Sequence, residues 1–391
     1  MKRITKSILV LFACFSFLEG TAQNLIDTIV TKAAGYDIPI RIKLPKKATG
    51  KSPVYFFIHG GGWNGGDATH VPPAGLNNDA NYLADQLEVI YVGLAYRCKG
   101  NNATFSDAIE DLEAAVQWLF DNADTYNADI TRIGFGGASA GSTLAAIMAQ
   151  KYKNCKLLVG AEGMYNLVEH SEERSTFPNQ KAREVYGLAT EEESKKASAY
   201  YNLRENPPST LLLHGDADVL CHYTQSIKFA EKIKSQGGEA KVVLHKEINH
   251  TTLNPSIPDV FKESVLEIAA LFIGQFKLNK NTNSLKALLD KRLKNQYAST
   301  EINESKLLGS WIRLQTKLVF KNDGNGFLEN LKTKKRHEFN YSFTNDNIKL
   351  IINNSSKVKT FKLKKNTNFI CEHIKEGFRI HRRFLYKKQK S

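Results

Sequence analysis

Three side-chain types that together catalyse acyl transfer occur along the chain in the order serine, aspartate, histidine. Ser139 lies in the stretch GGASAGS, which contains a GxSxG pattern. Asp218 comes shortly after the apolar run STLLLHG, and His250 directly follows VVLHKEIN. A serine hydroxyl becomes a nucleophile when a histidine accepts its proton and a carboxylate orients that histidine. We therefore predict Ser139 as nucleophile, His250 as base and Asp218 as the orienting acid.

Each of the last two assignments has a neighbouring alternative. Asp216 stands two residues before Asp218, and we favour Asp218 because it lies further into the loop that follows the strand pattern. His245 stands five residues before His250, but it falls inside the strand pattern itself. Residues that act in such a triad follow strands, so His250 is the preferred base.

A second glycine-rich stretch, HGGGWNGGD, begins at His59. Three consecutive glycines are costly in conformational entropy unless the backbone must approach something closely. An oxyanion hole is such a reason, because backbone N–H groups must point at a developing negative charge. We predict the amides of Gly61, Gly62 and Ala140 in this role, with Trp63 as a substrate contact. Neither glycine-rich stretch is followed by GK[ST], which argues against a phosphate site.

The segments that must position these residues alternate between apolar runs typical of strands and apolar side chains at helical spacing. Short apolar runs read as strands, and the residues from 105 to 119 repeat apolar side chains at helical spacing. Strands that alternate with helices predict an α/β fold, with a doubly wound, mostly parallel sheet. The charged segment 166–208 interrupts the pattern. It could form a lid over the site or a solvated connection, and the sequence leaves both readings open.

The last part of the chain has a different pattern. Apolar residues alternate with polar ones and are separated by Asn, Asp and Gly turns, which predicts an all-β unit. The stretches LLGSWIRL and LVFKNDGNGFL resemble small lipocalin-like β-barrel modules of secreted bacterial proteins. We therefore expect a catalytic domain over 23–278, a helical linker over 279–304 and a β domain over 305–391. The β domain could hold a ligand or serve as a spacer.

Almost all of the excess charge lies in this β domain. Residues 301–391 contain 21 Lys and Arg against 8 Asp and Glu, whereas the first 300 residues contain 33 against 32. A basic module attracts acidic glycans or membrane surfaces by long-range electrostatics. No aromatic ribonucleoprotein motif accompanies the charge, which argues against nucleic acid as a partner.

The first 22 residues read as a cleaved signal peptide, with a basic start, an apolar run and cleavage near Ala22. The apolar run is shorter than a membrane-spanning helix, so we expect a secreted or periplasmic protein that is not transmembrane. Phe12 is bulky for a lipoprotein site at Cys14. Four cysteines remain and could form disulfides whose pairing the sequence leaves open; they are Cys98, Cys155, Cys221 and Cys371. They form no CxxC pair, and we expect no metal site.

Taken together, HGGGWNGGD, LAYR, AIEDLEAAVQWL, DITRIGFGGASAG and HGDADV resemble α/β-hydrolase esterases that carry an HGG(G)W motif. These include hormone-sensitive-lipase-like carboxylesterases and acetyl xylan or feruloyl esterases. The resemblance covers about residues 26–276. Ser142 departs from it, since many relatives have glycine there, and so does the INHTTL setting of His250.

The resemblance implies a serine ester hydrolase that needs no cofactor and acts on short acyl or feruloyl esters of carbohydrate, including polysaccharide. The alternatives are a peptidase or amidase of the same fold, or a glycan-binding protein whose basic β domain is its main functional part.

Overall fold

The computed structural model describes two parts of the chain. The first part comprises residues 24–66, 79–169, 186–255 and 257–297. The second comprises the strands and short turns between residues 309 and 388, with gaps at 314–315, 322–323, 345–346, 353–357, 364–368, 374, 377–378 and 381–383. The predicted signal peptide, residues 1–22, lies outside the described residues.

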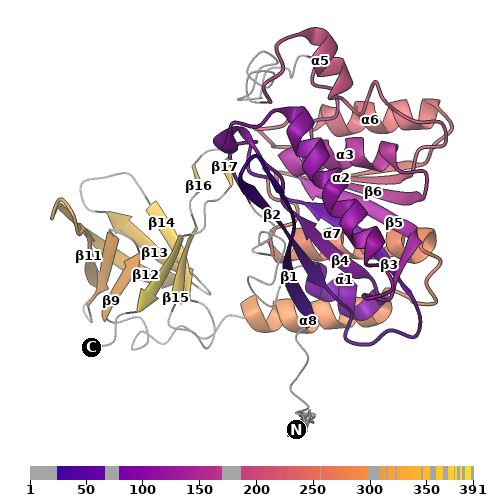
Figure 1. The fold of residues 1–391 in the computed structure, drawn as a ribbon. Coiled ribbons are helices and arrows are strands. Elements are labelled where there is room, and N and C mark those ends of the chain that lie inside the picture. The colour runs from indigo at the N-terminus through magenta and orange to yellow at the C-terminus, as the bar shows by residue number, and fades with distance from the viewer. Residues whose placement is uncertain are drawn as a thin grey trace, which may run out of the picture.

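The first part is built on one eight-stranded sheet (Figure 1). Its strands stand in the order β1-β2-β4-β3-β5-β6-β7-β8. The first two pairings, β1 with β2 and β2 with β4, are antiparallel, and all the others are parallel. The strands are β1 Leu25–Ala33, β2 Tyr36–Lys43, β3 Ser52–Ile58, β4 Ile90–Leu94, β5 Ala128–Ala138, β6 Cys155–Ala161, β7 Ser209–Gly215 and β8 Ala240–His245.

Helices cover both faces of this sheet. Side chains of α2 Phe105–Asp121, α3 Ala140–Lys151 and α6 Thr224–Ser235 belong to one buried apolar cluster. Those of α1 Asp79–Leu87, α7 Pro258–Gln275 and α8 Asn283–Tyr297 belong to a second cluster. Two shorter helices, the 3₁₀ turn η2 Lys99–Asn101 and α5 Glu191–Lys196, lie in connections.

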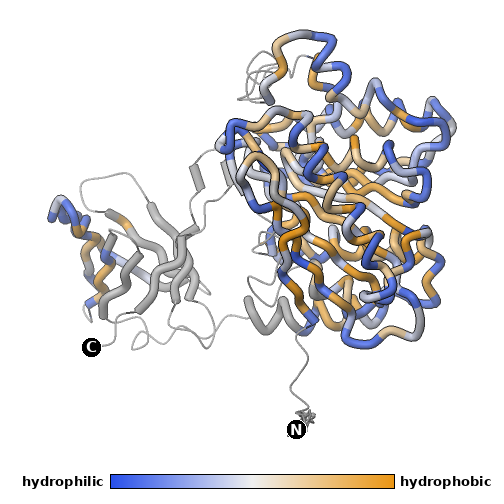
Figure 2. Tube along the Cα trace, viewed as in Figure 1, coloured by the Kyte–Doolittle hydropathy of each residue, from blue (hydrophilic) through white to orange (hydrophobic). Residues whose placement is uncertain are grey.

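Side chains along each strand alternate between the two faces of the sheet, and this alternation assigns them to one cluster or the other. In β3, Val54, Phe56 and Ile58 pack into the first cluster, while Tyr55 and Phe57 pack into or against the second. Successive side chains of a strand point to opposite faces, so a strand with helices on both sides must be apolar throughout. The hydrophobic segments accordingly run through the middle of the domain (Figure 2).

The second part contains a closed antiparallel barrel with the strand order β10-β11-β12-β13-β14-β15-β18-β9. Leu318, Phe320, Phe339 and Tyr341 are buried in it. The strands are β9 Gly309–Arg313, β10 Thr316–Phe320, β11 Asn325–Asn330, β12 Arg336–Thr344, β13 Asn347–Ile352, β14 Val358–Leu363, β15 Phe369–His373 and β18 Phe384–Lys388, with a separate pair β16 Lys375–Glu376 and β17 Arg379–Ile380.

These observations confirm the predicted fold class, an α/β domain on a mostly parallel sheet followed by a small all-β unit. The domain limits 23–278, 279–304 and 305–391 stay predictions, although α8 does lie within the predicted linker. No helix in the described ranges is both long enough and apolar enough to cross a membrane.

Candidate active site

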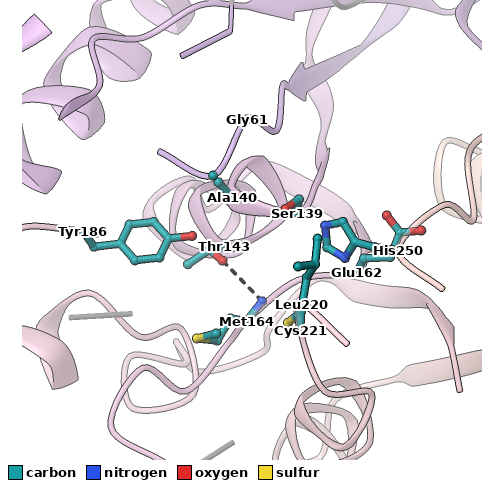
Figure 3. Close-up of a pocket in the computed structure, with 11 residues that line it drawn as sticks. Gly61, Ser139, Ala140, Thr143, Glu162, Met164, Tyr186, Leu220, Cys221 and His250 are labelled. Carbon is teal, nitrogen blue, oxygen red and sulfur yellow. Dashed lines mark hydrogen bonds between the residues drawn. The ribbon is translucent and has the colours of Figure 1, made fainter. Parts of the chain in front are cut away.

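Ser139 occupies the sharp turn between β5 and α3. Its backbone angles are φ 55° and ψ −124°, a conformation that is costly for a residue with a side chain. The turn is fixed by a hydrogen bond from the Ser139 N–H to the Ala161 carbonyl of β6, at 2.8 Å. Such strain persists where the surroundings enforce it, and it concentrates at functional sites. The turn places the Ser139 side chain at the wall of a cavity of about 350 Å³ (Figure 3).

Glycines on either side of Ser139 let the turn pack against its neighbours. A Cβ atom on Gly141 would lie 2.1 Å from the Ile58 carbonyl oxygen of β3. A Cβ atom on Gly137 would lie 2.4 Å from the Gly141 carbonyl. Real Cβ atoms do not approach backbone this closely, so the elbow needs glycine at both positions. The close packing of the turn is therefore a physical reason for the two glycines of the GxSxG pattern.

The HGGG loop follows β3 and faces the same turn. The His59 ring stacks on Tyr96 with ring centres 4.4 Å apart, and the Tyr96 hydroxyl donates to the His59 carbonyl at 3.0 Å. Gly61 has φ 127°, and a Cβ atom on it would lie 1.9 Å from the Gly65 carbonyl oxygen. Gly61 and Gly62 line the cavity.

Ala140 is the first residue of α3 and lines the cavity beside Ser139 (Figure 3). Its N–H belongs to the first turn of the helix, where backbone donors have no partner within the helix and the helix dipole favours negative charge. The three predicted oxyanion residues, Gly61, Gly62 and Ala140, therefore lie together around Ser139. Their role in catalysis is a prediction that this geometry permits.

The predicted acid and base are in direct contact. Asp218 lies in the loop after β7, and His250 lies in the loop after β8. His250 Nδ1 is 2.7 Å from Asp218 Oδ2. The other carboxylate oxygen of Asp218 accepts the N–H groups of Leu220 at 2.8 Å and Cys221 at 3.0 Å. Asp218 is 1% exposed, so these bonds hold the carboxylate in one orientation, and His250 lines the cavity with Ser139.

The alternatives left open by the sequence lie elsewhere. Asp216 accepts the Glu247 N–H on the loop after β8, at 2.6 Å. His245 is buried at the end of that strand, 3.0 Å from the Ser264 hydroxyl and 3.3 Å from a carboxylate oxygen of Glu263. Neither Asp216 nor His245 lines the cavity among the described residues. The geometry therefore favours the pair chosen from the sequence.

A second histidine supports Asp218. His214, at the end of β7, is fully buried, and its Nε2 is 2.9 Å from the Cys221 carbonyl and 3.3 Å from Asp218 Oδ2. Its Nδ1 is 2.7 Å from the Ser226 hydroxyl of α6. His214 was not among the predicted site residues. Its position four residues before Asp218, in HGDAD, is the signal that could have found it.

These contacts move both pKa values in the directions that favour an ion pair. Burial raises the pKa of Asp218, but hydrogen bonds from His214 and His250 outweigh it and hold that pKa well below its usual value. Burial lowers the pKa of His250, while the hydrogen bond to Asp218 and the charges of Glu162 and Asp218 raise it, and the net pKa is higher than usual. The site therefore stabilises an imidazolium at His250.

The prediction that Trp63 contacts substrate needs correction. Its side chain is 1% exposed and does not line the cavity. It stacks between Tyr96 and Phe105, with ring centres 5.6 Å away in each case, and packs at 5.2 Å on Tyr186. The HGGGW tryptophan thus supports Tyr186, which does line the cavity.

The remaining walls of the cavity were not found from the sequence. Tyr186 comes from the charged segment 166–208, of which residues 170–185 lie outside the described residues. The Thr143 hydroxyl accepts the Met164 N–H at 3.3 Å (Figure 3). The other lining side chains are Glu162, Leu220 and Cys221.

Three of the four cysteines that follow the predicted signal peptide are free thiols. Cys98, Cys155 and Cys221 are buried thiols, so no disulfide joins any two of them. Burial raises the pKa of Cys155 to about 12 and that of Cys221 well above its ordinary value. The side chain of Cys371 lies outside the described residues. Protonated, buried thiols act as small apolar groups rather than as nucleophiles.

Comparisons with known proteins agree with this architecture. Residues 40–233 match the family model BD-FAE. Arylacetamide deacetylase of Bos taurus is 34% identical over 144 residues, which are 36% of this chain and 35% of that protein. Carboxylesterase NlhH of Mycobacterium tuberculosis is 35% identical over 127 residues, 31% of this chain and 38% of that protein. The chain thus spans little more than a third of the length of these two relatives.

Solved structures show the same fold. Thermogutta terrifontis esterase 2 superimposes with a TM-score of 0.57 at 20% identity, covering 66% of this chain and 96% of that one. At this identity the likeness establishes the fold alone.

Proposed function

Because the chain is an α/β hydrolase of the esterase group, we propose that it hydrolyses carboxylic esters by a serine mechanism. The observation that carries the proposal is the strained Ser139 turn, which opens into the same cavity as the Asp218–His250 pair. A binding protein has no physical need to keep a serine in a strained backbone beside such a pair.

In this mechanism the two nitrogens of His250 have different tasks. Nδ1 is committed to Asp218, so Nε2 is the nitrogen that takes the proton of the Ser139 hydroxyl. The serine oxygen then attacks the ester carbonyl, and the N–H groups of Gly61, Gly62 and Ala140 stabilise the oxyanion. His250 returns the proton to the departing alcohol, and a water molecule releases the acyl group by the same steps in reverse. No metal or organic cofactor takes part.

The substrate we propose is a short acyl or feruloyl ester of carbohydrate. A cavity of about 350 Å³ lined by Met164, Leu220, Tyr186 and Cys221 suits a small apolar or aromatic acyl group.

The test is hydrolysis of nitrophenyl acetate and butyrate, acetylated xylan and methyl ferulate by the purified protein. Ser139→Ala should lower kcat by about 10³-fold or more. Ser142→Ala is the matched control, since Ser142 lies in the same helix turn but its hydroxyl pairs with the Tyr165 hydroxyl at 2.9 Å. Activity that survives Ser139→Ala, or its absence on every ester, would refute the proposal.

Amide hydrolysis is the second candidate, because relatives of 32–34% identity are named arylacetamide deacetylase. The same serine, base and oxyanion donors act on amides and esters. Phenacetin-type aryl acetamides assayed beside phenyl acetate decide which class is preferred.

We further propose that the protein is secreted or periplasmic and that its basic barrel contacts acidic glycans. The signal-like residues 1–22 support export. In the turn between β11 and β12, Lys332, Lys334 and Lys335 are exposed. Salt-sensitive retention of the full-length protein on a uronic-acid polysaccharide tests the contact, with the triple Lys→Gln variant of this turn as control. Equal retention of both proteins would assign the contact to another surface.

A further inference from the structure

The order of the strands in the sheet determines the position of Glu162 in the candidate active site. Glu162 is the first residue after β6, the strand that lies between β5 and β7. Its backbone has φ 52°, and its N–H donates to the Leu213 carbonyl of β7 at 2.9 Å. The side chain is 4% exposed and lines the cavity together with Ser139 and His250 (Figure 3). A residue with a side chain and positive φ is uncommon, and it persists where the surroundings enforce it.

The carboxylate of Glu162 holds the loop that carries His250. One of its oxygens accepts the backbone N–H of Thr252, two residues beyond His250. Thr252 is fully buried, and its carbonyl accepts the Ser264 hydroxyl of α7 at 3.2 Å. The loop is therefore fixed from two sides, by a carboxylate on β6 and by a hydroxyl on the covering helix.

The charged side chain in the described wall of the cavity is that of Glu162. Among the described residues that line the cavity, Glu162 is the one carboxylate, and no Lys or Arg lines it. Burying a carboxylate without a cation is costly. Among the lining residues that the structure describes, the side chain that can become cationic is His250, when it has taken the serine proton.

The groups that face His250 come from three elements. Asp218 comes from the loop after β7, with His214 behind it. Cys221 of the same loop lines the cavity, and its thiol donates to the Gly163 carbonyl at 2.9 Å. Glu162 comes from the end of β6. His245 lies on the far side of the loop, where the Ser264 hydroxyl joins it to the Thr252 carbonyl. Burial lowers the pKa of His250, and the Asp218 hydrogen bond and the Glu162 charge raise it above its ordinary value.

We propose that Glu162 is a positioning residue for His250, whose carboxylate holds the histidine loop through the Thr252 N–H and whose charge stabilises the imidazolium formed in the transition state. Asp218 orients one nitrogen of the ring by direct contact, and Glu162 acts through the backbone and the electrostatic field. The inference rests on the proposed serine mechanism.

Two substitutions separate the hydrogen bond from the charge. Glu162→Gln keeps an acceptor for the Thr252 N–H and removes the charge, whereas Glu162→Met removes both and keeps the size. Glu263→Gln is the matched control. It removes a carboxylate that faces His245 at 3.3 Å, and Glu263 does not line the active-site cavity. The measurements are kcat and KM for nitrophenyl butyrate from pH 5 to 9, with the melting temperature of each variant.

We expect Glu162→Gln to lower kcat at pH 8 by about threefold to tenfold and to move the acidic limb of kcat/KM down by about 0.5 to 1 pH unit. The limb moves down because loss of the negative charge lowers the pKa of the base. Glu162→Met should show the same shift of the limb and also melt several degrees lower, since a buried N–H loses its acceptor. Glu263→Gln should leave kcat and the limb unchanged.

An unshifted limb with kcat within twofold of wild type in Glu162→Gln would overturn the proposal. A change confined to KM would also overturn it, because it would make Glu162 a substrate contact. Titration of the His250 ring signal by NMR, with His250→Gln for assignment, reads the same charge effect without turnover. The two failures are therefore distinguishable: absence of ester hydrolysis by wild type refutes the proposed function, whereas an unchanged His250 titration in Glu162→Gln refutes the charge effect of Glu162.

Discussion

Asp218→Asn is the most informative substitution at the proposed triad. The carboxylate oxygen Oδ1 accepts the N–H groups of Leu220 and Cys221, so an asparagine keeps its carbonyl oxygen there. Its NH₂ group must then occupy the place of Oδ2, which lies 2.7 Å from His250 Nδ1. An amide NH₂ donates, so His250 Nδ1 has to accept and its proton moves to Nε2.

The magnitude follows from this change of tautomer. With a proton on Nε2, His250 has no lone pair for the Ser139 hydroxyl, and the reaction proceeds only through the rare opposite tautomer. We expect kcat to fall by about 10⁴-fold, which corresponds to about 5.4 kcal/mol of transition-state stabilisation. KM should change by less than about threefold, because Asp218 does not line the cavity.

The assay is nitrophenyl acetate hydrolysis at pH 8, with circular dichroism to verify that the variant is folded. Asp216→Asn is the matched control, since its carboxylate accepts the Glu247 N–H and lies outside the cavity. It should retain at least half of the wild-type kcat. A loss of kcat smaller than about tenfold in Asp218→Asn would refute the assignment of the acid. A loss of kcat in Asp216→Asn that exceeds the loss in Asp218→Asn would refute it as well.

Three further predictions concern stability and chemistry. Gly141→Ala should reduce soluble expression and lower the melting temperature by more than 5 °C, because its Cβ would lie 2.1 Å from the Ile58 carbonyl; an unchanged melting temperature would contradict the close packing of the turn. The pKa of Asp218 is lowered on folding, so its stabilisation is complete above the unfolded value of about 3.9 and is lost as the pH falls below it; wild type should therefore lose more thermal stability between pH 5 and pH 3 than Asp218→Asn, in melts followed by circular dichroism. The three buried thiols should react with Ellman's reagent only after denaturation, and rapid labelling of the native protein at any of them would show that the cysteines are accessible.

The sequence was sufficient to predict the fold class, the Ser139 turn and the Asp218–His250 pair, but not the other walls of the cavity. Ser139 could be identified because its turn needs small neighbours, and the structure shows the clash that any Cβ at Gly141 would produce. Asp218 and His250 could be identified because each follows a strand, and parallel strands bring their carboxyl ends to one edge. These predictions depend on local backbone requirements. Such requirements restrict the residue types at each position, so they can be seen in a single sequence.

Contacts between distant segments could not be predicted in this way. Trp63 stands next to the oxyanion glycines in sequence, but its ring is buried against Tyr96, Phe105 and Tyr186. Trp63 has a positive φ of 63°, and the direction of its side chain depends on which space the distant segments of the fold leave unfilled. Tyr186, from a segment without a clear pattern, could not be assigned to the cavity for the same reason.

The order of the strands explains why Glu162 belongs to the site although no motif marks it. The proposed nucleophile follows β5, the proposed acid follows β7 and the proposed base follows β8, and β6 lies between β5 and β7. Whatever residue follows β6 must therefore lie between Ser139 and the Asp218–His250 pair. Glycine or serine there would leave the cavity neutral, whereas a glutamate adds a second buried carboxylate beside the histidine. Because the position is fixed by topology and the charge by sequence, Glu162→Gln changes the electrostatics of the base without moving the residues that we propose carry out the chemistry.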